Sequence, residues 1–276
     1  MNRNIAIGAA LCGAALLGAL AVAYSNAQGD KSVGKTVSVP APVTPSTTAF
    51  TTDEEQAVRA IVRNYLLEHP EVLVEAMQAF DRKQETARLD LAKSKIAALV
   101  APEHGYVAGA NPATAQVAVI ELFDYHCGFC KKATGLVRER TKSDPAVKVI
   151  FRELPILREE SEYAAKAALA ARAQGKYQEF HFAMMESPGV LTKERVEEIA
   201  KSKGIDLARL HADISSRAVK ESIEETERIA RDLDVDGTPT FIIASLNGDF
   251  VEVVGGFSPE RVADAIAEAK KAAKRK

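Results

Sequence analysis

The segment Cys127-Gly128-Phe129-Cys130, set between an apolar run and a helical pattern, constrains the fold more than any other feature of this chain. The preceding run, 116–123, is mostly apolar and has the length of a buried strand. A helical pattern extends from Cys127 to about Arg140, and residues 147–152 are again apolar and β-branched. Strand, helix and strand in this order, with short connections, predict a βαβ unit with a parallel pair of strands.

The two cysteines occupy the first turn of the predicted helix, where a sulfur atom has distinctive chemistry. Unpaired backbone N–H groups and the helix dipole favour negative charge at a helix start. This environment lowers the pKa of Cys127, so that its reactive thiolate is available at neutral pH. Cys130, three residues later, is close enough to resolve a mixed disulfide formed by Cys127. We therefore predict Cys127 as the nucleophile and Cys130 as the resolving thiol, with no cofactor beyond their own redox-active disulfide.

Two other interpretations of the cysteine pair receive less support from the sequence. A zinc site needs two further Cys or His ligands, whereas the sequence contains no second Cys-x-x-Cys and its five histidines are scattered singly. Copper or zinc would then bind the pair only opportunistically. A purely structural bridge across so small a loop would constrain little of the unfolded chain. The sequence therefore favours redox chemistry, and no metal site is predicted.

The charge balance of the 276-residue chain bears on its partners. It has 36 basic and 38 acidic side chains, for a formal net charge of -2, and 47% of its residues are hydrophobic. Binding to nucleic acid needs a clustered basic excess. The composition therefore favours a globular protein that does not bind nucleic acid.

The first 27 residues have the pattern of a secretory signal peptide. Arg3 provides a short positive region, residues 5–22 are almost entirely Ala, Leu, Gly, Ile and Val, and small residues follow at 21–23 and 25–27. The competing interpretation is an uncleaved membrane anchor, because the apolar run approaches the length of a spanning helix. Cleavage would remove Cys12, the third of the three cysteines. The mature protein would then carry only the Cys-x-x-Cys pair into an oxidising compartment, the periplasm.

Two segments separate this leader from the cysteine-containing part of the chain. Residues 28–52 hold three prolines among Ser, Thr, Val and Gly, and we expect a flexible linker. Residues 53–100 predict a helical arm with Thr52 as its N-cap and an interruption at Pro70. Apolar residues recur at helical spacing on both sides of the interruption. Such a stripe must pack on the domain, on another subunit, or on both.

The remainder of the chain predicts an α/β domain with a helical insertion. Residues 102–112 contain two glycines and an Asn-Pro pair, so we expect a loop there. A helical block occupies about 160–234. Residues 240–243 and 250–254 predict a hairpin around Asn247-Gly248, and a closing helix begins after Ser258.

The sequence around the two cysteines resembles a known family. The segment Phe123-Asp124-Tyr125-His126-Cys127-Gly128-Phe129-Cys130-Lys131-Lys132 is similar to the active site of the DsbA-type branch of thioredoxin-fold proteins. Gly237-Thr238-Pro239-Thr240 matches the cis-proline loop of that branch, in which Thr238 and Pro239 would present backbone to the substrate. The resemblance covers about 114–276. It implies a thioredoxin fold with an inserted helical domain, preceded by the helical arm.

The resemblance also implies roles for residues around the cysteines. Glu121 matches a buried acid that assists proton transfer in the family, and its alternative is an ordinary acid on an exposed strand face. His126 would stabilise the thiolate when protonated, or else be a solvated loop residue. Gly128 and Phe129 occupy the positions that tune the redox potential in the family. They differ from the Pro-His pair of DsbA itself, whose histidine favours the thiolate, so a strongly oxidising potential is not expected.

A second resemblance lies in the arm. Residues 61–73, followed by Glu75-Ala76-Met77, resemble the N-terminal segment of ScsC-like proteins, named for suppression of copper sensitivity. Such arms can mediate oligomers, and clustered catalytic domains suit an enzyme that must hold a misfolded client while reshuffling its disulfides.

These features give one leading hypothesis and two alternatives. The leading hypothesis is a periplasmic disulfide isomerase or reductase that forms a homo-oligomer through its arm. Its clients would be unfolded or misoxidised exported proteins, and its redox partner a membrane protein resembling ScsB, DsbD or DsbB. One alternative is a monomeric DsbA-like dithiol oxidase. The other is a copper-binding or chaperone-like protein for which turnover is incidental.

Overall fold

The computed structural model of the chain describes residues 50–109, 111 and 113–275. The predicted signal peptide, and residues 28–49 of the predicted linker, lie outside these described residues. The strands are β1 (Tyr106–Ala108), β2 (Val117–Phe123), β3 (Val147–Glu153), β4 (Thr240–Ser245) and β5 (Val251–Gly255). The helices are α1 (Thr52–Glu68), α2 (Glu71–Leu99), α3 (Gly128–Ser143), α4 (Glu159–Ala171), α5 (Tyr177–Glu186), α6 (Lys193–Ser202), α7 (Leu207–Ile214), α8 (Arg217–Asp232) and α9 (Pro259–Ala273), with a 3₁₀ turn at Arg172–Gln174.

The five strands form one mixed sheet in the order β1-β3-β2-β4-β5. Strands β2 and β3 are parallel and are connected by α3, so the predicted βαβ unit is confirmed. Strands β4 and β5 form the predicted antiparallel hairpin, and β4 pairs antiparallel with β2. The active-site strand β2 is therefore central, and every one of its residues is buried.

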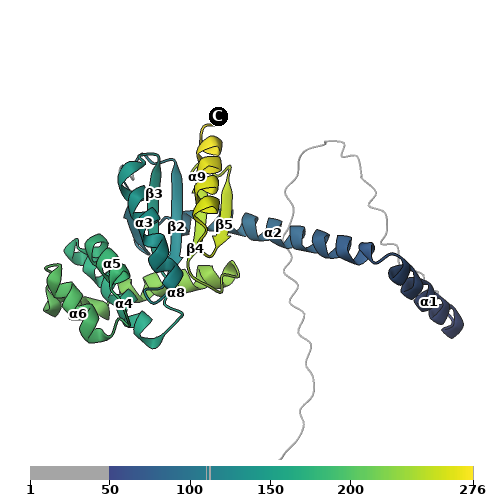
Figure 1. The fold of residues 1–276 in the computed structure, drawn as a ribbon, viewed down its shortest axis with the longest axis horizontal. Helices are drawn as coiled ribbons and strands as arrows, with labels where there is room; N and C mark the ends of the chain where they lie inside the picture. The colour runs from purple at the N-terminus through teal and green to yellow at the C-terminus, as the bar shows by residue number, and fades with distance from the viewer. Residues whose placement is uncertain (1–49, 110, 112, 276) are drawn as a thin grey trace, which may run out of the picture. The chain divides into compact units, whose positions relative to one another are not determined.

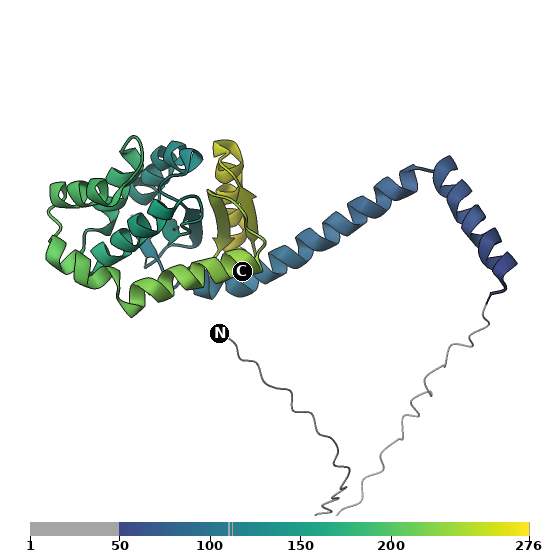
Figure 2. The same ribbon diagram turned by 90° about the horizontal axis from the view of Figure 1, so that it is seen from below.

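Helices cover both faces of the sheet. Side chains on both faces of β2 are therefore buried, which explains why its sequence is a nearly continuous apolar run. One face packs against α3, α9 and the helices of the insertion, and its core includes Val119, Phe123 and Phe151. The other face packs against α8 and the C-terminal part of α2, with Ile120 and Ile150 in its core. Figure 1 shows α3 and α9 beside the sheet, and Figure 2 shows α8 beside the C-terminal half of α2.

The segment 102–112, which we predicted to be a loop, contains the short edge strand β1. This strand pairs antiparallel with β3, Tyr106 lying opposite Phe151. A Cβ at Gly105 would lie 2.7 Å from the carbonyl oxygen of Phe151, so only glycine allows the chain to approach β3 this closely. The prediction missed β1 because three residues show no period and their pairing partner is more than 40 residues away.

The helical arm forms with the interruption predicted at Pro70. Helix α1 ends at Glu68 and α2 begins at Glu71. The predicted cap is displaced by one residue, because Thr51 caps α1 rather than Thr52. Thr51 Oγ1 accepts from the Glu54 N–H at 3.3 Å, and the Glu54 carboxylate accepts from the Thr51 N–H at 2.9 Å. This reciprocal pair is a capping box.

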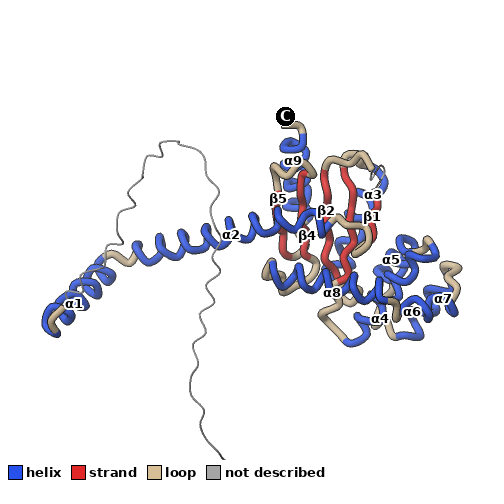
Figure 3. Tube along the Cα trace, turned by 180° about the vertical axis from the view of Figure 1, so that it is seen from behind, coloured by secondary structure: helices blue, strands red, loops and turns tan. Residues whose placement is uncertain are grey.

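Only the C-terminal part of α2 packs on the domain, where Ala92 and Leu99 are fully buried. Figure 3 shows this part of α2 crossing the sheet near β5 and β4. Arg152 of β3, also fully buried, donates to the Ala98 carbonyl at 3.1 Å and to Thr226 Oγ1 at 3.0 Å. Burial lowers the pKa of Arg152 to about 10. The end of α2 is therefore tied to both the sheet and α8.

Between β3 and β4 the chain forms α4 to α8, which agrees with the predicted helical block. Several of these helices begin at side-chain caps: Thr192, Asp206 and Ser216 each accept from a backbone N–H three residues later. The 3₁₀ turn after α4 ends at Gly175, whose φ of +66° is left-handed. Among the described residues, no helix combines the length and apolar composition needed to cross a bilayer.

Candidate active site at the start of helix α3

The reacting sulfurs lie where the C-terminal end of β2 leads into α3. Cys127 is the N-cap residue of α3, and its Sγ accepts from the Cys130 N–H at 3.2 Å. Both cysteines are free thiols, so the structure describes the reduced dithiol. Cys130 is completely buried, whereas Cys127 keeps 4% of its surface exposed. Cys127 is thus the more accessible of the two sulfurs.

The loop before β4 forms the opposite wall of the site. The Thr238–Pro239 peptide bond is cis, as the family resemblance implied. The Cys127 thiol donates to the Thr238 carbonyl oxygen at 3.1 Å, although 111 residues separate the two. Thr240 Oγ1 donates to the Gly237 carbonyl at 2.8 Å, and the Gly256 N–H donates to the Pro239 carbonyl at 2.9 Å. These bonds hold the loop against the sheet, with Thr238 facing the reacting sulfur.

The environment separates the acidities of the two thiols. The pKa of Cys127 is lowered to about 6, chiefly by the hydrogen bond with the Cys130 side chain. Burial opposes this, while the Thr238 side chain and the backbone N–H groups of Cys130 and Phe129 lower the pKa further. The pKa of Cys130 is raised, chiefly by burial. At neutral pH Cys127 is therefore mainly thiolate and Cys130 is a thiol.

Thr238 contacts the Cys127 sulfur through its backbone. Its carbonyl oxygen can only accept, so the 3.1 Å bond belongs to the protonated thiol. Its hydroxyl is buried and has no hydrogen-bond partner among the described residues. A hydroxyl can donate to a thiolate, which is the sense in which the Thr238 side chain lowers the pKa of Cys127.

Glu121 lies on β2, on the same face of the sheet as Phe123, and it is buried. The alternative of an acid on an exposed strand face is therefore wrong. Burial and, second to it, the negative charge of Cys127 together raise the pKa of Glu121 to about 8. The charge of Glu121 in turn raises the pKa of Cys130. Its carboxyl group is thus coupled to both thiols, as a proton-transfer role requires.

His126 differs from both expectations for it, because it is neither charged nor solvated. The His126 side chain is only 4% exposed, and burial is the main cause that lowers its pKa. Its Nδ1 lies 2.9 Å from Ser161 Oγ, and its Nε2 accepts from the Leu191 N–H at 3.0 Å. An acceptor nitrogen carries no proton, so the ring is a neutral imidazole held by the helical insertion.

Gly128 and Phe129, the pair between the cysteines, face open space. A Cβ at Gly128 would meet no atom within 4 Å. The Phe129 side chain is 58% exposed, and Lys132 Nζ lies 5.0 Å from its ring centroid. Neither residue provides a hydrogen-bond donor from its side chain to Cys127. The lowered pKa of Cys127 therefore comes from backbone groups, Cys130 and Thr238.

Asp124 is a site residue to which the sequence analysis gave no role. Its buried carboxylate accepts from the backbone N–H of His126 at 2.7 Å, from Ser161 Oγ at 2.8 Å and from the backbone N–H of Leu157 at 3.0 Å. It thus joins the loop that carries Cys127 to the start of α4. An aspartate immediately after an apolar strand was the available signal, but two of its three partners are more than 30 residues away.

A second group of buried polar residues lies beneath the site. Glu153 Oε1 accepts from the Tyr177 hydroxyl at 2.7 Å and from the Tyr125 hydroxyl at 3.3 Å, while His181 Nδ1 is 3.0 Å from the same Tyr125 hydroxyl. Burial raises the pKa of Glu153 well above its ordinary value and lowers that of His181 to about 3, so His181 is neutral near pH 7. This network fixes Tyr125, two residues before Cys127.

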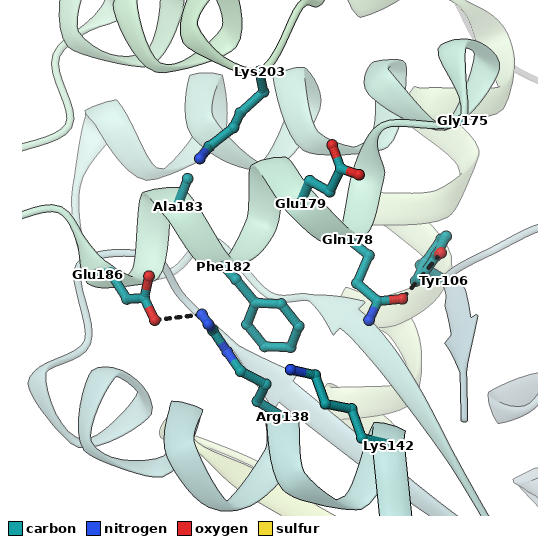
Figure 4. A pocket seen from close by; sticks show the side chains of 10 residues that line it. All are labelled: Tyr106, Arg138, Lys142, Gly175, Gln178, Glu179, Phe182, Ala183, Glu186 and Lys203. Atoms are coloured by element: carbon teal, nitrogen blue, oxygen red, sulfur yellow. Dashed lines mark hydrogen bonds and ion pairs between the residues drawn. The ribbon is translucent and has the colours of Figure 1, made fainter. Parts of the chain in front are cut away.

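A surface pocket of about 480 Å³ lies between α3 and α5 (Figure 4). None of its ten lining residues belongs to the cysteine site. Its charged residues are of both signs, and Arg138 pairs with Glu186 while stacking 4.3 Å over the Phe182 ring. Within the described chain, no group of three or more His, Cys, Asp or Glu side chains is placed to hold a metal ion.

The sheet, the Cys-x-x-Cys pair capping the helix after its central strand, and the cis-proline loop facing that pair define a thioredoxin-fold protein of the thiol–disulfide oxidoreductase type. The model of the DSBA-like thioredoxin domain matches residues 118–267, more than half of the chain. The chain therefore belongs to the DSBA-like thioredoxin domain family. Residues 54–87 match the N-terminal domain of the copper resistance protein ScsC.

Solved structures extend the likeness to the arm. A thioredoxin-like oxidoreductase from Silicibacter pomeroyi is 38% identical and covers 62% of this chain and 95% of its own, with a TM-score of 0.57. BcfH of Salmonella enterica Typhimurium is 28% identical over 79% of this chain and 96% of its own, with a TM-score of 0.63. Proteus mirabilis ScsC in a transitional conformation is 25% identical over 80% and 98%, with a TM-score of 0.56.

The curated relatives are longer proteins. Na(+)/H(+) antiporter NhaA 3 of Salinispora tropica is 31% identical over 152 residues, which are 52% of this chain and 22% of the antiporter. The chain thus matches less than a quarter of the length of these relatives.

Proposed function

We propose that this protein is a thiol–disulfide oxidoreductase of exported proteins, acting chiefly as a disulfide isomerase or reductase. The observation that carries the proposal is the contrast between the two sulfurs. Cys127, with its pKa lowered to about 6, lies beside Thr238 and keeps 4% of its surface exposed, while Cys130 is fully buried with a raised pKa. This pairing provides a thiolate for attack and a protected thiol for resolution.

The reaction begins when the Cys127 thiolate attacks one sulfur of a client disulfide. A mixed disulfide forms between Cys127 and that sulfur, and the other client sulfur leaves as a thiolate. In isomerisation, this released thiolate or another client thiolate attacks the mixed disulfide and frees Cys127. In reduction, Cys130 attacks Cys127, so that the enzyme disulfide forms and the second client sulfur leaves as a thiolate that takes up a proton.

Glu121 is suited to accept the proton that Cys130 loses during resolution. The negative charge of Cys127 raises the pKa of Glu121 in the reduced protein. The mixed disulfide removes that charge, so the pKa of Glu121 falls when Cys130 must be deprotonated. Glu121 is therefore more fully in its carboxylate form, and so free to accept a proton, at the step that needs a base.

The arm supports the choice of isomerase over monomeric oxidase. In α1, Val58, Ile61, Val62 and Tyr65 form one exposed apolar stripe at helical spacing. In the first half of α2, Leu73, Met77 and Phe80 are at least half exposed, Met77 at 67% and Phe80 at 61%. Contiguous exposed apolar stripes of this kind mark sites of interaction, most often with another protein or a membrane. We propose that the arm of a second copy covers them, and that the resulting homo-oligomer clusters its active sites.

Light scattering on purified protein and refolding of scrambled ribonuclease test this function together. We expect a mass of several subunits and recovery of ribonuclease activity that needs Cys127. Replacing Met77 and Phe80 by glutamate should give monomers, whereas Gln78→Glu, which adds a charge beside the stripe, should not. A monomeric wild type that introduces disulfides into reduced ribonuclease but cannot rearrange scrambled ribonuclease would instead identify the dithiol oxidase.

The third hypothesis is a copper-binding or chaperone-like protein for which turnover is incidental, and the cysteine pair offers it only two soft ligands. A Cys127→Ser variant that keeps full metal tolerance and client protection in cells would favour it over the oxidoreductase.

The compartment and the redox partner are part of the same proposal. The apolar residues 5–22 support export to the periplasm or anchoring in the inner membrane. An isomerase or reductase must be kept in the dithiol state, so its partner would be a membrane thiol–disulfide reductant. A potential near that of protein disulfide isomerase in a glutathione titration would support this arrangement.

A further inference from the structure

Residues 187–192, the α5–α6 loop, are fastened to both sides of the cysteine motif. On one side, Lys131 Nζ donates to the Ser187 carbonyl oxygen at 2.6 Å. On the other side, the Leu191 N–H donates to His126 Nε2 at 3.0 Å. The residues before and after the Cys-x-x-Cys pair thus hold the same loop of the helical insertion. Of these two hydrogen bonds, only the one to His126 depends on an unprotonated nitrogen.

The hydrogen bonds around His126 run in a single direction. Because Leu191 N–H can only donate, Nε2 must be the unprotonated nitrogen of a neutral ring. The proton is therefore on Nδ1, which donates to Ser161 Oγ at 2.9 Å. Ser161 Oγ then donates to the Asp124 carboxylate at 2.8 Å. The chain from Leu191 through His126 and Ser161 to Asp124 is consistent with one tautomer only.

We propose that His126 is a positioning residue, a latch whose neutral ring holds the α5–α6 loop and the start of α4 against the cysteine-bearing loop and which opens when the ring is protonated. The proposal deepens the proposed oxidoreductase function, on which it rests. Protonation would place an N–H on Nε2 opposite the Leu191 N–H, and two donors cannot bond to each other.

The groups facing His126 determine the pH at which the latch opens. Asp124 and Glu160 favour the protonated ring, whereas burial, Arg158 and Lys131 oppose it. Burial is the largest of these influences, and the net effect lowers the pKa of His126 below its ordinary value of 6.5. The α5–α6 loop itself contributes no charged side chain. The latch is therefore closed at neutral pH and opens as the solution becomes acidic.

The latched segments carry exposed apolar side chains. Val190 precedes Leu191 in the α5–α6 loop, and Leu157, whose N–H is held by Asp124, precedes α4. Both are at least 40% exposed. Opening the latch would move these side chains relative to Cys127, so we expect it to raise the KM for an unfolded client. The pKa of Cys127 should change little, because His126 is not among the main groups that shift this pKa.

Hydrogen exchange of the Leu191 amide in the full chain tests the latch. After correction for intrinsic exchange, we expect wild-type protection to fall about tenfold between about pH 7.5 and about pH 5, the effect of one lost hydrogen bond. In His126→Gln, an amide oxygen can accept from Leu191 but cannot be protonated, so protection should not vary with pH. In His126→Phe, protection should be low at both pH values. Equal protection in wild type at both pH values would overturn the proposal.

Kinetic measurements on the same proteins separate the latch from a purely structural role. We expect His126→Phe to raise the client KM about tenfold without shifting the ultraviolet titration of the Cys127 thiolate. If His126→Phe does not fold, the pH dependence that distinguishes wild type from His126→Gln decides alone. Failure of Cys127 to exchange with glutathione would refute the proposed function. If Cys127 still exchanges with glutathione but protection of the Leu191 amide does not vary with pH, only the latch is refuted.

Discussion

The cysteine pair shows how one helical turn gives two identical side chains different chemistry. Cys127 caps α3 and accepts hydrogen bonds, whereas Cys130 lies inside the core on the first turn. Hydrogen bonds therefore stabilise one sulfur as an anion, and burial keeps the other neutral. The distinction follows from position, since both residues are cysteines and neither has a charged partner within its motif.

The pKa of Cys127 gives the first prediction. Thiolate absorbance of the reduced protein should titrate with a midpoint near pH 6 and should be absent in Cys127→Ser. Cys130→Ala should raise the midpoint, because the Cys130 side chain is the largest cause of the lowered pKa. A wild-type midpoint near that of an ordinary thiol, about 8.5, would contradict this account of the site.

Glu121 gives a prediction about stability and pH. Its folded-state pKa of about 8 exceeds the ordinary value of 4.5, so the folded protein binds the proton more tightly. The stability it contributes is full below pH 4.5 and is lost as pH rises through 8. At about pH 9, Glu121→Gln should unfold with a free energy greater than wild type by a few kcal/mol, at about 1.4 kcal/mol per pKa unit.

Guanidinium unfolding of the reduced protein at acidic and alkaline pH measures this difference. Exposed Glu139→Gln on α3 is the matched control and should unfold like wild type at both pH values. Client reduction by Glu121→Gln should also be slower at the resolving step, since a glutamine cannot accept the Cys130 proton. A variant with wild-type resolution would remove Glu121 from the mechanism.

At the scale of elements, the glycine before β1 and a glycine inside α3 illustrate opposite constraints. Gly105 lies where a Cβ would be 2.7 Å from the Phe151 carbonyl and 2.9 Å from Arg152 Cδ. Gly135 lies inside α3, where a Cβ would meet nothing within 4 Å. The first glycine is required by the close approach of two strands, and the second only lowers the helix propensity.

Alanine substitutions should therefore have opposite signs. We expect Gly105→Ala to lower the free energy of unfolding by about 1–3 kcal/mol, because the edge strand must shift away from β3. Gly135→Ala should raise it by up to about 1 kcal/mol. Thermal denaturation compares the two directly, and stabilisation by Gly105→Ala would show that β1 does not pack as described.

At the scale of the whole molecule, different buried titratable groups make stability depend on pH in opposite directions. His181 lies among the rings of Phe123, Phe151 and Tyr177 and is neutral, with its pKa lowered to about 3. The unfolded chain binds a proton at this histidine below pH 6.5, whereas the folded protein does not. Its stabilising effect is therefore full above pH 6.5 and is lost as pH falls toward 3, the reverse of Glu121.

Acid sensitivity should accordingly depend on His181. In His181→Phe the loss of unfolding free energy between about pH 7 and about pH 4 should be smaller than in wild type. Exposed Glu139→Gln on α3 serves again as the control and should keep the wild-type dependence. An unchanged pH dependence in His181→Phe would assign the acid sensitivity to other groups.

Patterns local in sequence predicted much of this protein. The βαβ unit, the hairpin after Pro239, the break at Pro70 and the placement of Cys127 before Cys130 depend on periodicity, capping and turn residues within a few positions. Figure 1 shows these elements where the sequence placed them. Similarity to a family predicted the cis isomer before Pro239 and the placement of the helical insertion. Interactions between residues close in sequence do not determine either feature.

Only the tertiary structure decided which distant groups meet. The distant partners of Asp124 and His126 lie just before α4, on α4 and in the α5–α6 loop, 33 to 65 residues along the chain. Whether His126 is an imidazolium or a neutral acceptor depends on burial and on the direction of those bonds. The cysteine pair thus follows from sequence because its chemistry is confined to one helical turn. The state of the groups around it does not, because desolvation and hydrogen bonding there are set by segments that folding alone brings together.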